Sequence, residues 1–246
     1  MKKSAIVLSS LVFAAAAFGA EEGQPAQSAV DEKIPWTPLE LCLASPLQVP
    51  FECWNVYGLR LSVFFGQSRD VYGLDLGLVG RTSGDMFGLQ AGGFNWVENW
   101  MAGAEFGAVA NLVNGDATGL QVAGALNYDT GLFQGFQCAF VNCDKNFEGL
   151  QVGAINWNYG LSAGLQIGVA NANPTDEYAG WAIGAVNCAV NFTGAQFGAV
   201  NAAEKMTGFQ LGLFNAATTL NGVQIGVLNV AGNAALPILP VCNGRF

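Results

Sequence analysis

The residues best able to do chemistry in this sequence are two carboxylates, Asp75 and Glu105, which lie in the same part of the chain as Arg60. Two carboxylates held a fixed distance apart are what glycoside hydrolysis requires, and charged side chains lining a channel can filter solutes. A partly solvated ion pairing with Arg60 is the simpler interpretation, because isolated charges on sheet faces usually have only that role. We therefore predict no catalytic residues.

The sequence contains no histidine, so Ser-His-Asp and Cys-His catalysis and imidazole metal ligands are excluded. Six cysteines occur, but none have Cys-x-x-Cys spacing, and we predict no redox centre, metal site or cofactor. Cys42 and Cys53 bracket a short loop that contains two prolines, and in an exported protein they could form a disulfide. The pairing of the other four cysteines stays open.

The elements that must position these groups belong to a tandem repeat of about 15 residues that begins at Gly58. Positions are counted from the central residue of each copy. Glycine stands at −2 in every copy, apolar residues stand at −1 and +1, a small residue stands at +2, and Asn stands at +5 in eight copies, as in Phe147 to Asn156. The twelve centres are Arg60, Asp75, Gln90, Glu105, Gln121, Gln137, Gln151, Gln166, Ala182, Gln196, Gln210 and Gln224.

Within each copy apolar and polar residues alternate with a period of two, which predicts β-strands rather than helices. The residues at −2, 0 and +2 then share one face of a strand. A row of Gln flanked by Gly could line a polar pore or bind sugars. We favour a structural ladder, in which each Gln amide hydrogen-bonds the next, because repeated residues usually serve the repeat.

Two all-β architectures fit about 12 tandem strands, one per repeat. In an antiparallel outer-membrane β-barrel, the ±1 residues would face lipid and the centres would line the lumen. In a parallel β-solenoid, the residues at ±1 and ±4 would point inward and the glycines would turn corners. Each copy is nearly palindromic, the number of copies is even and the chain ends in Phe246, so we favour the barrel and keep the solenoid as the alternative.

The chain divides into three segments. Residues 1–20 have two lysines followed by a short apolar run and small residues, which predicts a secretory signal peptide. Residues 21–55 contain five prolines and several charges and predict an extended entry segment, and residues 56–246 form the tandem β-repeat domain. All 18 acidic residues follow the predicted leader, whereas two of the nine Lys and Arg lie within it, so nucleic acid is not an expected partner.

The Gly-apolar-Gln-apolar-Gly-x-x-Asn units, such as Gly149 to Asn156 and Gly222 to Asn229, resemble a bacterial tandem surface-repeat family of uncharacterised exported and outer-membrane proteins. The resemblance covers about residues 56–246. It implies an envelope or surface location and brings no known activity. The sequence departs from the pattern at Arg60, Asp75, Glu105 and Ala182.

These observations lead to two hypotheses about function. The first is a non-enzymatic protein of the outer membrane or cell surface, with a structural, pore or surface-exposed role and membrane lipid as its partner. The second is a secreted or surface-tethered β-solenoid that acts as an adhesion or carbohydrate-binding scaffold, with a glycan or small polar solute as its ligand. The sequence leaves the oligomeric state open.

Overall fold

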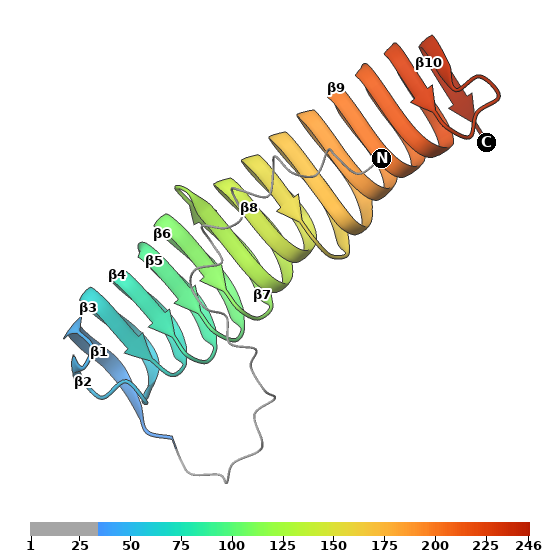
Figure 1. Ribbon diagram of the computed structural model, residues 1–246. Coiled ribbons are helices and arrows are strands. Elements are labelled where there is room, and N and C mark those ends of the chain that lie inside the picture. The colour runs from blue at the N-terminus through green and yellow to red at the C-terminus, as the bar shows by residue number, and fades with distance from the viewer. Residues whose placement is uncertain (1–33) are drawn as a thin grey trace. The chain divides into compact units, whose positions relative to one another are not determined.

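The computed structural model describes residues 34–246, and these form one elongated stack of β-strands with no helix (Figure 1). The all-β prediction is confirmed. The predicted leader and the beginning of the entry segment lie outside the described residues. The strands are β1 (Trp36–Ala44), β2 (Leu47–Val49), β3 (Asn55–Ser68), β4 (Val71–Thr82), β5 (Met86–Val97), β6 (Met101–Val113), β7 (Ala117–Ala123), β8 (Leu126–Asn158), β9 (Ser162–Ala231) and β10 (Ile238–Arg245).

Consecutive repeats pair in parallel and in register, which makes the molecule a β-solenoid. Arg60 of β3 lies opposite Asp75 of β4, which in turn lies opposite Gln90 of β5. The antiparallel barrel favoured from the sequence is therefore wrong, and the alternative architecture is the one observed. The nearly palindromic sequence of each copy is compatible with antiparallel pairing. Tandem repetition also gives every copy an equivalent neighbour, and parallel stacking requires nothing more.

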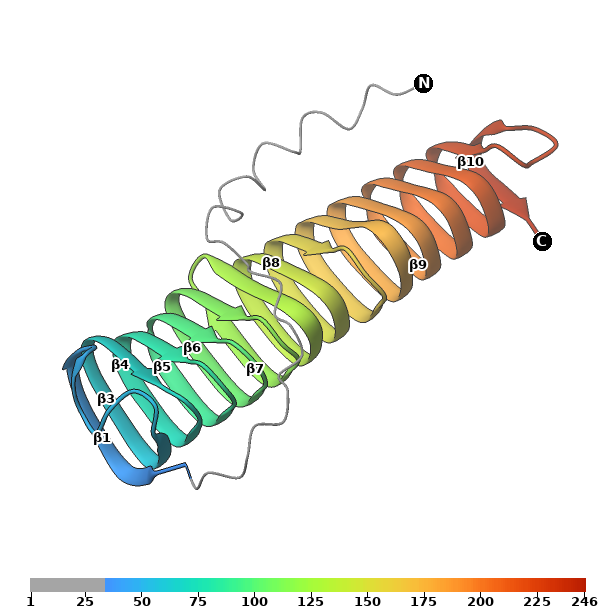
Figure 2. The same cartoon turned by 60° about the horizontal axis from the view of Figure 1, so that its bottom comes forward.

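Each repeat forms one rung of the stack, and Figure 2 shows the rungs as flattened coils that follow one another along the axis. One arm of the rung covers positions −4 to +2, a bend covers +3 and +4, and a second arm covers +5 to about +7. A turn of variable sequence leads to the next rung. The long strand β8 contains two repeat centres and β9 contains five, because the backbone stays extended through these bends.

The inward positions are −4, the centre, +5 and about +7, whereas −1, +1, +3 and +4 face outward. Leu74 and Leu76, which flank the centre Asp75, are exposed while Asp75 is buried. The expectation that the ±1 residues of a solenoid point inward is thus wrong. The solenoid buries its amide-bearing face, since stacking lets those amides bond to one another.

Apolar packing inside the stack comes mainly from position −4. Phe133 and Phe147 occupy this position in adjacent rungs of the amino-terminal half, and their rings lie parallel with centroids 6.2 Å apart. A second cluster in the carboxy-terminal half includes Tyr178, Phe192 and Met206 at the same position. These two clusters give the hydrophobic contribution to the stability of the rungs.

A column of asparagines joins the two arms of the rungs. Every side chain except the last, Asn229, donates one hydrogen bond to the next asparagine in the column. Most donate a second to a backbone carbonyl on the opposite arm, as Asn171 does to Ile183. Two members, Asn111 and Asn127, lie at +6, because their rungs are longer by one residue. The column consists of Asn95, Asn111, Asn127, Asn142, Asn156, Asn171, Asn187, Asn201, Asn215 and Asn229.

Both ends of the stack depart from the repeat. At the amino-terminal end, β1 pairs in parallel with β3 and the short β2 pairs antiparallel with β1, so residues 36–49 of the predicted entry segment are part of the fold. At the carboxy-terminal end, β10 runs antiparallel to the last rung of β9. Pro240 lies within β10 and has no backbone N–H to offer a further strand.

The glycine at −2 is required by both conformation and space. All twelve have φ between 126° and 146°, which side-chain-bearing residues rarely adopt. At Gly149, a Cβ would lie only 2.0 Å from the carbonyl oxygen of Gly135 in the preceding rung. The twelve glycines at −2 therefore form a column in which the backbone of one rung lies directly against that of the next.

We predict that Gly149→Ala lowers the free energy of unfolding by at least about 2 kcal/mol, because it adds both backbone strain and a clash with a backbone oxygen. The measurement is the midpoint of urea unfolding, followed by far-ultraviolet circular dichroism. Gly244→Ala is the matched control, since a Cβ there meets nothing closer than 3.4 Å. Equal destabilisation by the two substitutions would contradict the proposed need for glycine at −2.

Candidate functional site

The row of repeat centres runs through the interior and is inaccessible to solvent. Gln137 donates to Gln121 over 2.8 Å, and Gln151 donates to Gln137 over 2.9 Å. The same bond joins Gln166 to Gln151, Gln210 to Gln196 and Gln224 to Gln210. The glutamines therefore form a ladder inside the stack and meet neither solutes nor sugars from outside.

Ala182 interrupts this ladder. A large residue at position −4 of the same rung fills the space that a glutamine side chain would occupy. Tyr178, at position −4 of the same rung, is almost completely buried and donates its hydroxyl to the carbonyl oxygen of Gly164 over 3.0 Å. The sequence marks Ala182 as a departure from the pattern, but it gives no sign that a tyrosine four residues earlier takes up the space.

Arg60 and Asp75 form a completely buried ion pair. The Arg60 guanidinium donates from two nitrogens to the two Asp75 oxygens, with Nε 2.7 Å from Oδ1, and it also bonds the carbonyl oxygen of Arg81. The predicted pairing is present, but it is not partly solvated. Glu40, on the other side of Arg60, lies at the equivalent position of β1 and accepts bonds from the Ser68 hydroxyl.

Glu105 lies two rungs beyond Asp75 and does not share a site with it. Burial, followed by the nearby Asp129 charge, raises the pKa of Glu105 to about 8. Glu105 is the in-register neighbour of Gln90, and the Oε1 atom of each residue has no hydrogen-bond partner. Both oxygens are acceptors that lack a donor, so protonation of Glu105 is favoured in the folded chain, in the same direction as its raised pKa.

Two further buried carboxyls, Asp129 and Asp144, were not identified as site residues from the sequence. They occupy the second arm of adjacent rungs and both accept bonds from Gln137 Nε2. Burial raises the pKa of each, and the charge of Asp129 raises that of Asp144 further. Their spacing in the sequence could have identified them. Each stands two residues after an asparagine of the column, and residues two apart in a strand point to the same face, here the interior.

The disulfide that Cys42 and Cys53 could form is not present in the structure. All six cysteines lie among the described residues and have free thiols, with Cys42 buried and Cys53 exposed. The Cys42 thiol lies 3.0 Å from the carbonyl oxygen of Phe65 and 3.4 Å from Gln48 Oε1, and burial raises its pKa. Cys42 is thus held inside the first rung, whereas Cys53 is open to solvent.

The outer surface bears a continuous apolar face, which we define as positions −1, +1, +3 and +4 of the twelve rungs. Every residue at these 48 positions is apolar or glycine. Monomeric soluble proteins rarely expose an apolar patch of more than a few hundred Å². Its exposed large side chains are Leu61, Val63, Phe64, Leu74, Leu76, Leu78, Phe94, Phe106, Val109, Phe140, Ile167, Val169, Trp181, Ile183, Val186, Val200, Leu211, Leu213, Phe214, Ile225, Val227 and Leu228.

Charged residues gather at the turns between rungs, which we call the turn edge. This edge lies across the rung from the +3/+4 bend. Seven acidic and three basic residues occupy it, so it is acidic overall. They are Arg69, Asp70, Asp85, Glu98, Asp116, Lys145, Asp176, Glu177, Glu204 and Lys205.

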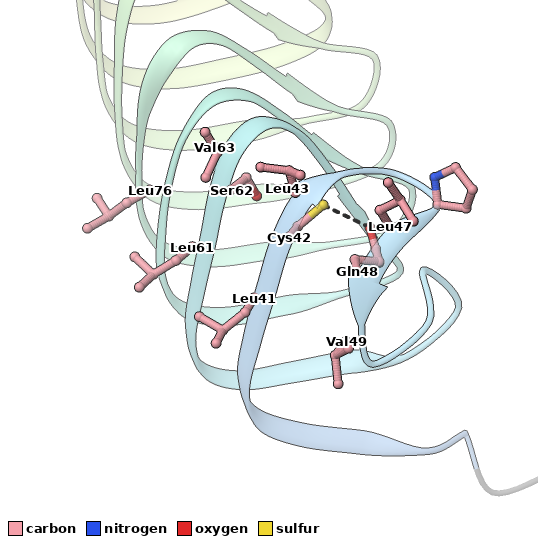
Figure 3. A pocket seen from close by; sticks show the side chains of 11 residues that line it. Leu41, Cys42, Leu43, Leu47, Gln48, Val49, Leu61, Ser62, Val63 and Leu76 are labelled. Atoms are coloured by element: carbon pink, nitrogen blue, oxygen red, sulfur yellow. Dashed lines mark hydrogen bonds between the residues drawn. The ribbon is translucent and has the colours of Figure 1, made fainter.

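An open groove of about 720 Å³ lies at the amino-terminal end of the apolar face (Figure 3). Its floor includes Leu61 and Leu76 of the face, and the β1–β2 hairpin adds Leu41, Leu47 and Val49. In Figure 3, Leu41, Leu61 and Leu76 project on the same side of the stack. The groove is thus an extension of the apolar face.

Comparisons with protein-family models, curated proteins and solved structures give no match to this chain. The described part of the chain has no helix of the length and apolarity needed to span a bilayer. It also contains no cluster of three or more cysteine or acidic side chains arranged to hold a metal ion.

The buried carboxyls predict that stability falls as the pH rises. Because the folded pKa of Glu105 is raised to about 8 from its ordinary value near 4.5, the folded state binds this proton more tightly than the unfolded chain. The stabilisation is complete below about pH 4.5 and is lost as the pH rises towards 8. We expect Glu105→Gln to remove part of this dependence and to raise the Tm at pH 9 by roughly 5 °C or more.

The measurement is the Tm of the native chain and of Glu105→Gln between pH 5 and pH 9. Glu177→Gln, on the exposed turn edge, is the matched control and should behave like the native chain. A native chain that is as stable at pH 9 as at pH 5 would show that Glu105 is not held neutral.

Proposed function

We propose that this chain is an exported, non-enzymatic scaffold of the bacterial cell surface and that its working site is the apolar face. The observation behind the proposal is the absence of any charged or amide side chain from the 48 outward positions of that face. Surfaces that stay in contact with water intersperse charges of both signs. A face of this composition is therefore built to be covered by another surface.

The burial of the reactive side chains supports the non-enzymatic part of the proposal. Arg60, Asp75 and Glu105 are all 1% exposed or less, so no substrate in solvent can touch them. Their polar atoms are directed to neighbouring rungs. A catalytic role would require at least one of these groups at a cleft.

One aromatic ladder, at position −3 of the first rungs, argues against the sugar stacking that the carbohydrate-binding form of the scaffold hypothesis would use. Tyr57, Tyr72 and Phe87 stack on one another with centroids 4.7 and 4.9 Å apart and planes within 6° of parallel. Trp36 and Trp100 close the two ends of this ladder edge-on. The ring faces of these three residues are occupied by other rings, so this ladder offers no open face on which a sugar could stack, and we favour contact with a protein surface.

The proposal is tested by labelling cells that express the chain with a membrane-impermeant maleimide. Val169→Cys places a thiol on the apolar face, and Leu161→Cys places one on the turn edge, where the native side chain is equally exposed at 62%. We expect rapid labelling of Leu161→Cys and at least a tenfold slower reaction of Val169→Cys, read at each site by peptide mass mapping.

Two results would contradict the proposal. Equal labelling of the two positions would show that the apolar face is free at the cell surface. Failure of Leu161→Cys to react until the cells are lysed would show that the chain is not on the surface.

A further inference from the structure

We propose that the apolar face binds the apolar face of a second copy of this chain, which gives a face-to-face dimer with a two-fold axis. This inference rests on the proposed function, because it names the partner of the face described there. Three features of the structure identify a second copy as the occupant: the size of the face, its charge pattern and the way in which the ends of the stack are closed.

The size of the face matches what a stable dimer needs. Twelve parallel rungs spaced by about 4.8 Å extend roughly 50 Å along the stack, and the −1 to +3 positions span about 13 Å along each strand. The product is about 650 Å² on each copy, or roughly 1,300 Å² in total, before the +4 residues and the groove are counted. Specific interfaces bury about 1,200–2,000 Å², so two faces of this size are sufficient.

The charge pattern suits a second copy better than a lipid surface. The apolar face has no charge to conflict with its own copy, and interface cores are depleted of charge in the same way. The acidic turn edges lie across the rung from the +3/+4 bend, so a two-fold axis parallel to the stack places the edges of the two copies on opposite sides of the interface. Bacterial membranes that contain anionic lipid would repel an acidic chain that offers no basic cluster to hold it.

Additional strands at the two ends of the stack disfavour end-to-end self-association within residues 34–246. Tandem rungs could in principle continue from one molecule to the next, because each rung presents an open strand edge. The antiparallel β10 covers the last rung, and β2 covers part of β1. Side-to-side contact through identical faces is isologous and closes at two copies, whereas end-to-end contact would form fibres.

The test is sedimentation of the purified chain at micromolar concentration in buffer without detergent. We expect the native chain to sediment as a dimer. The double substitution Val169→Lys and Val227→Lys introduces two charges at positions that are 62% and 65% exposed in one copy, so it leaves the rungs intact. The dissociation constant should rise at least about 100-fold, because each lysine would be buried opposite an apolar surface.

Leu161→Lys is the matched control, since it makes the same kind of change on the turn edge at an equally exposed residue, and it should remain a dimer. Circular dichroism of all three chains establishes that each is folded. A native chain that is monomeric at this concentration would overturn the proposal, as would a dimer that the double substitution leaves unchanged. Binding of the native chain, as a monomer, to phosphatidylcholine or phosphatidylglycerol vesicles would overturn it in favour of lipid.

The outcome is separable from that of the proposed function. If Val169→Cys is protected on cells but reacts freely in the purified, monomeric chain, the face is a working site for a different partner. In that case the dimer is wrong and the scaffold proposal stands. If Val169→Cys is unprotected on cells although the purified chain is dimeric, the scaffold proposal fails on its own.

Discussion

The structure depends on a column of twelve glycines that lets the backbone of each rung lie directly on the next. At Gly149 and at its equivalents there is no room for a Cβ, and φ is positive throughout the column. This constraint fixes the register of the stack. When the −2 glycines of two adjacent rungs are aligned, their repeat centres are aligned too, and so are their column asparagines. The side-chain amides of adjacent rungs then lie at hydrogen-bonding distance.

Register in turn makes a polar interior possible. A buried amide without a partner costs about 1–3 kcal/mol, and a twelve-rung stack of isolated glutamines would not fold. In the ladder the oxygen of Gln137 accepts from Gln151 while its nitrogen reaches back to Gln121 and across to Asp129. The amino-terminal half also contains the ionisable groups Glu40, Arg60, Asp75, Glu105, Asp129 and Asp144, each held by its neighbours in the adjacent rungs.

The sequence predicted the strands, the repeat centres and the ladder interpretation of the glutamines, because a period of two and a fixed spacing follow from local geometry. It did not predict parallel pairing, since a nearly palindromic strand fits both directions. It also did not identify Glu40 as a rung centre, because Pro38 stands where a glycine would mark the copy. It did not identify Asp129 and Asp144 as inward-facing, because both lie outside the glycine-marked part of the repeat, and the fold of the rung places them in the interior.

The division between interior and exterior also separates folding from association. The rungs are held by the glycine column, the amide ladders and the −4 apolar column, all of which are satisfied within one chain. The residues of the apolar face contribute little to this, because side chains such as Val169 and Val227 remain largely exposed in a single copy. Their transfer from water can occur only against another surface, at about 25 cal/mol for each Å² of apolar area that is removed. The fold therefore leaves a hydrophobic free energy unused in the isolated chain, and it is available only to a partner whose surface is as long, straight and uncharged as this one.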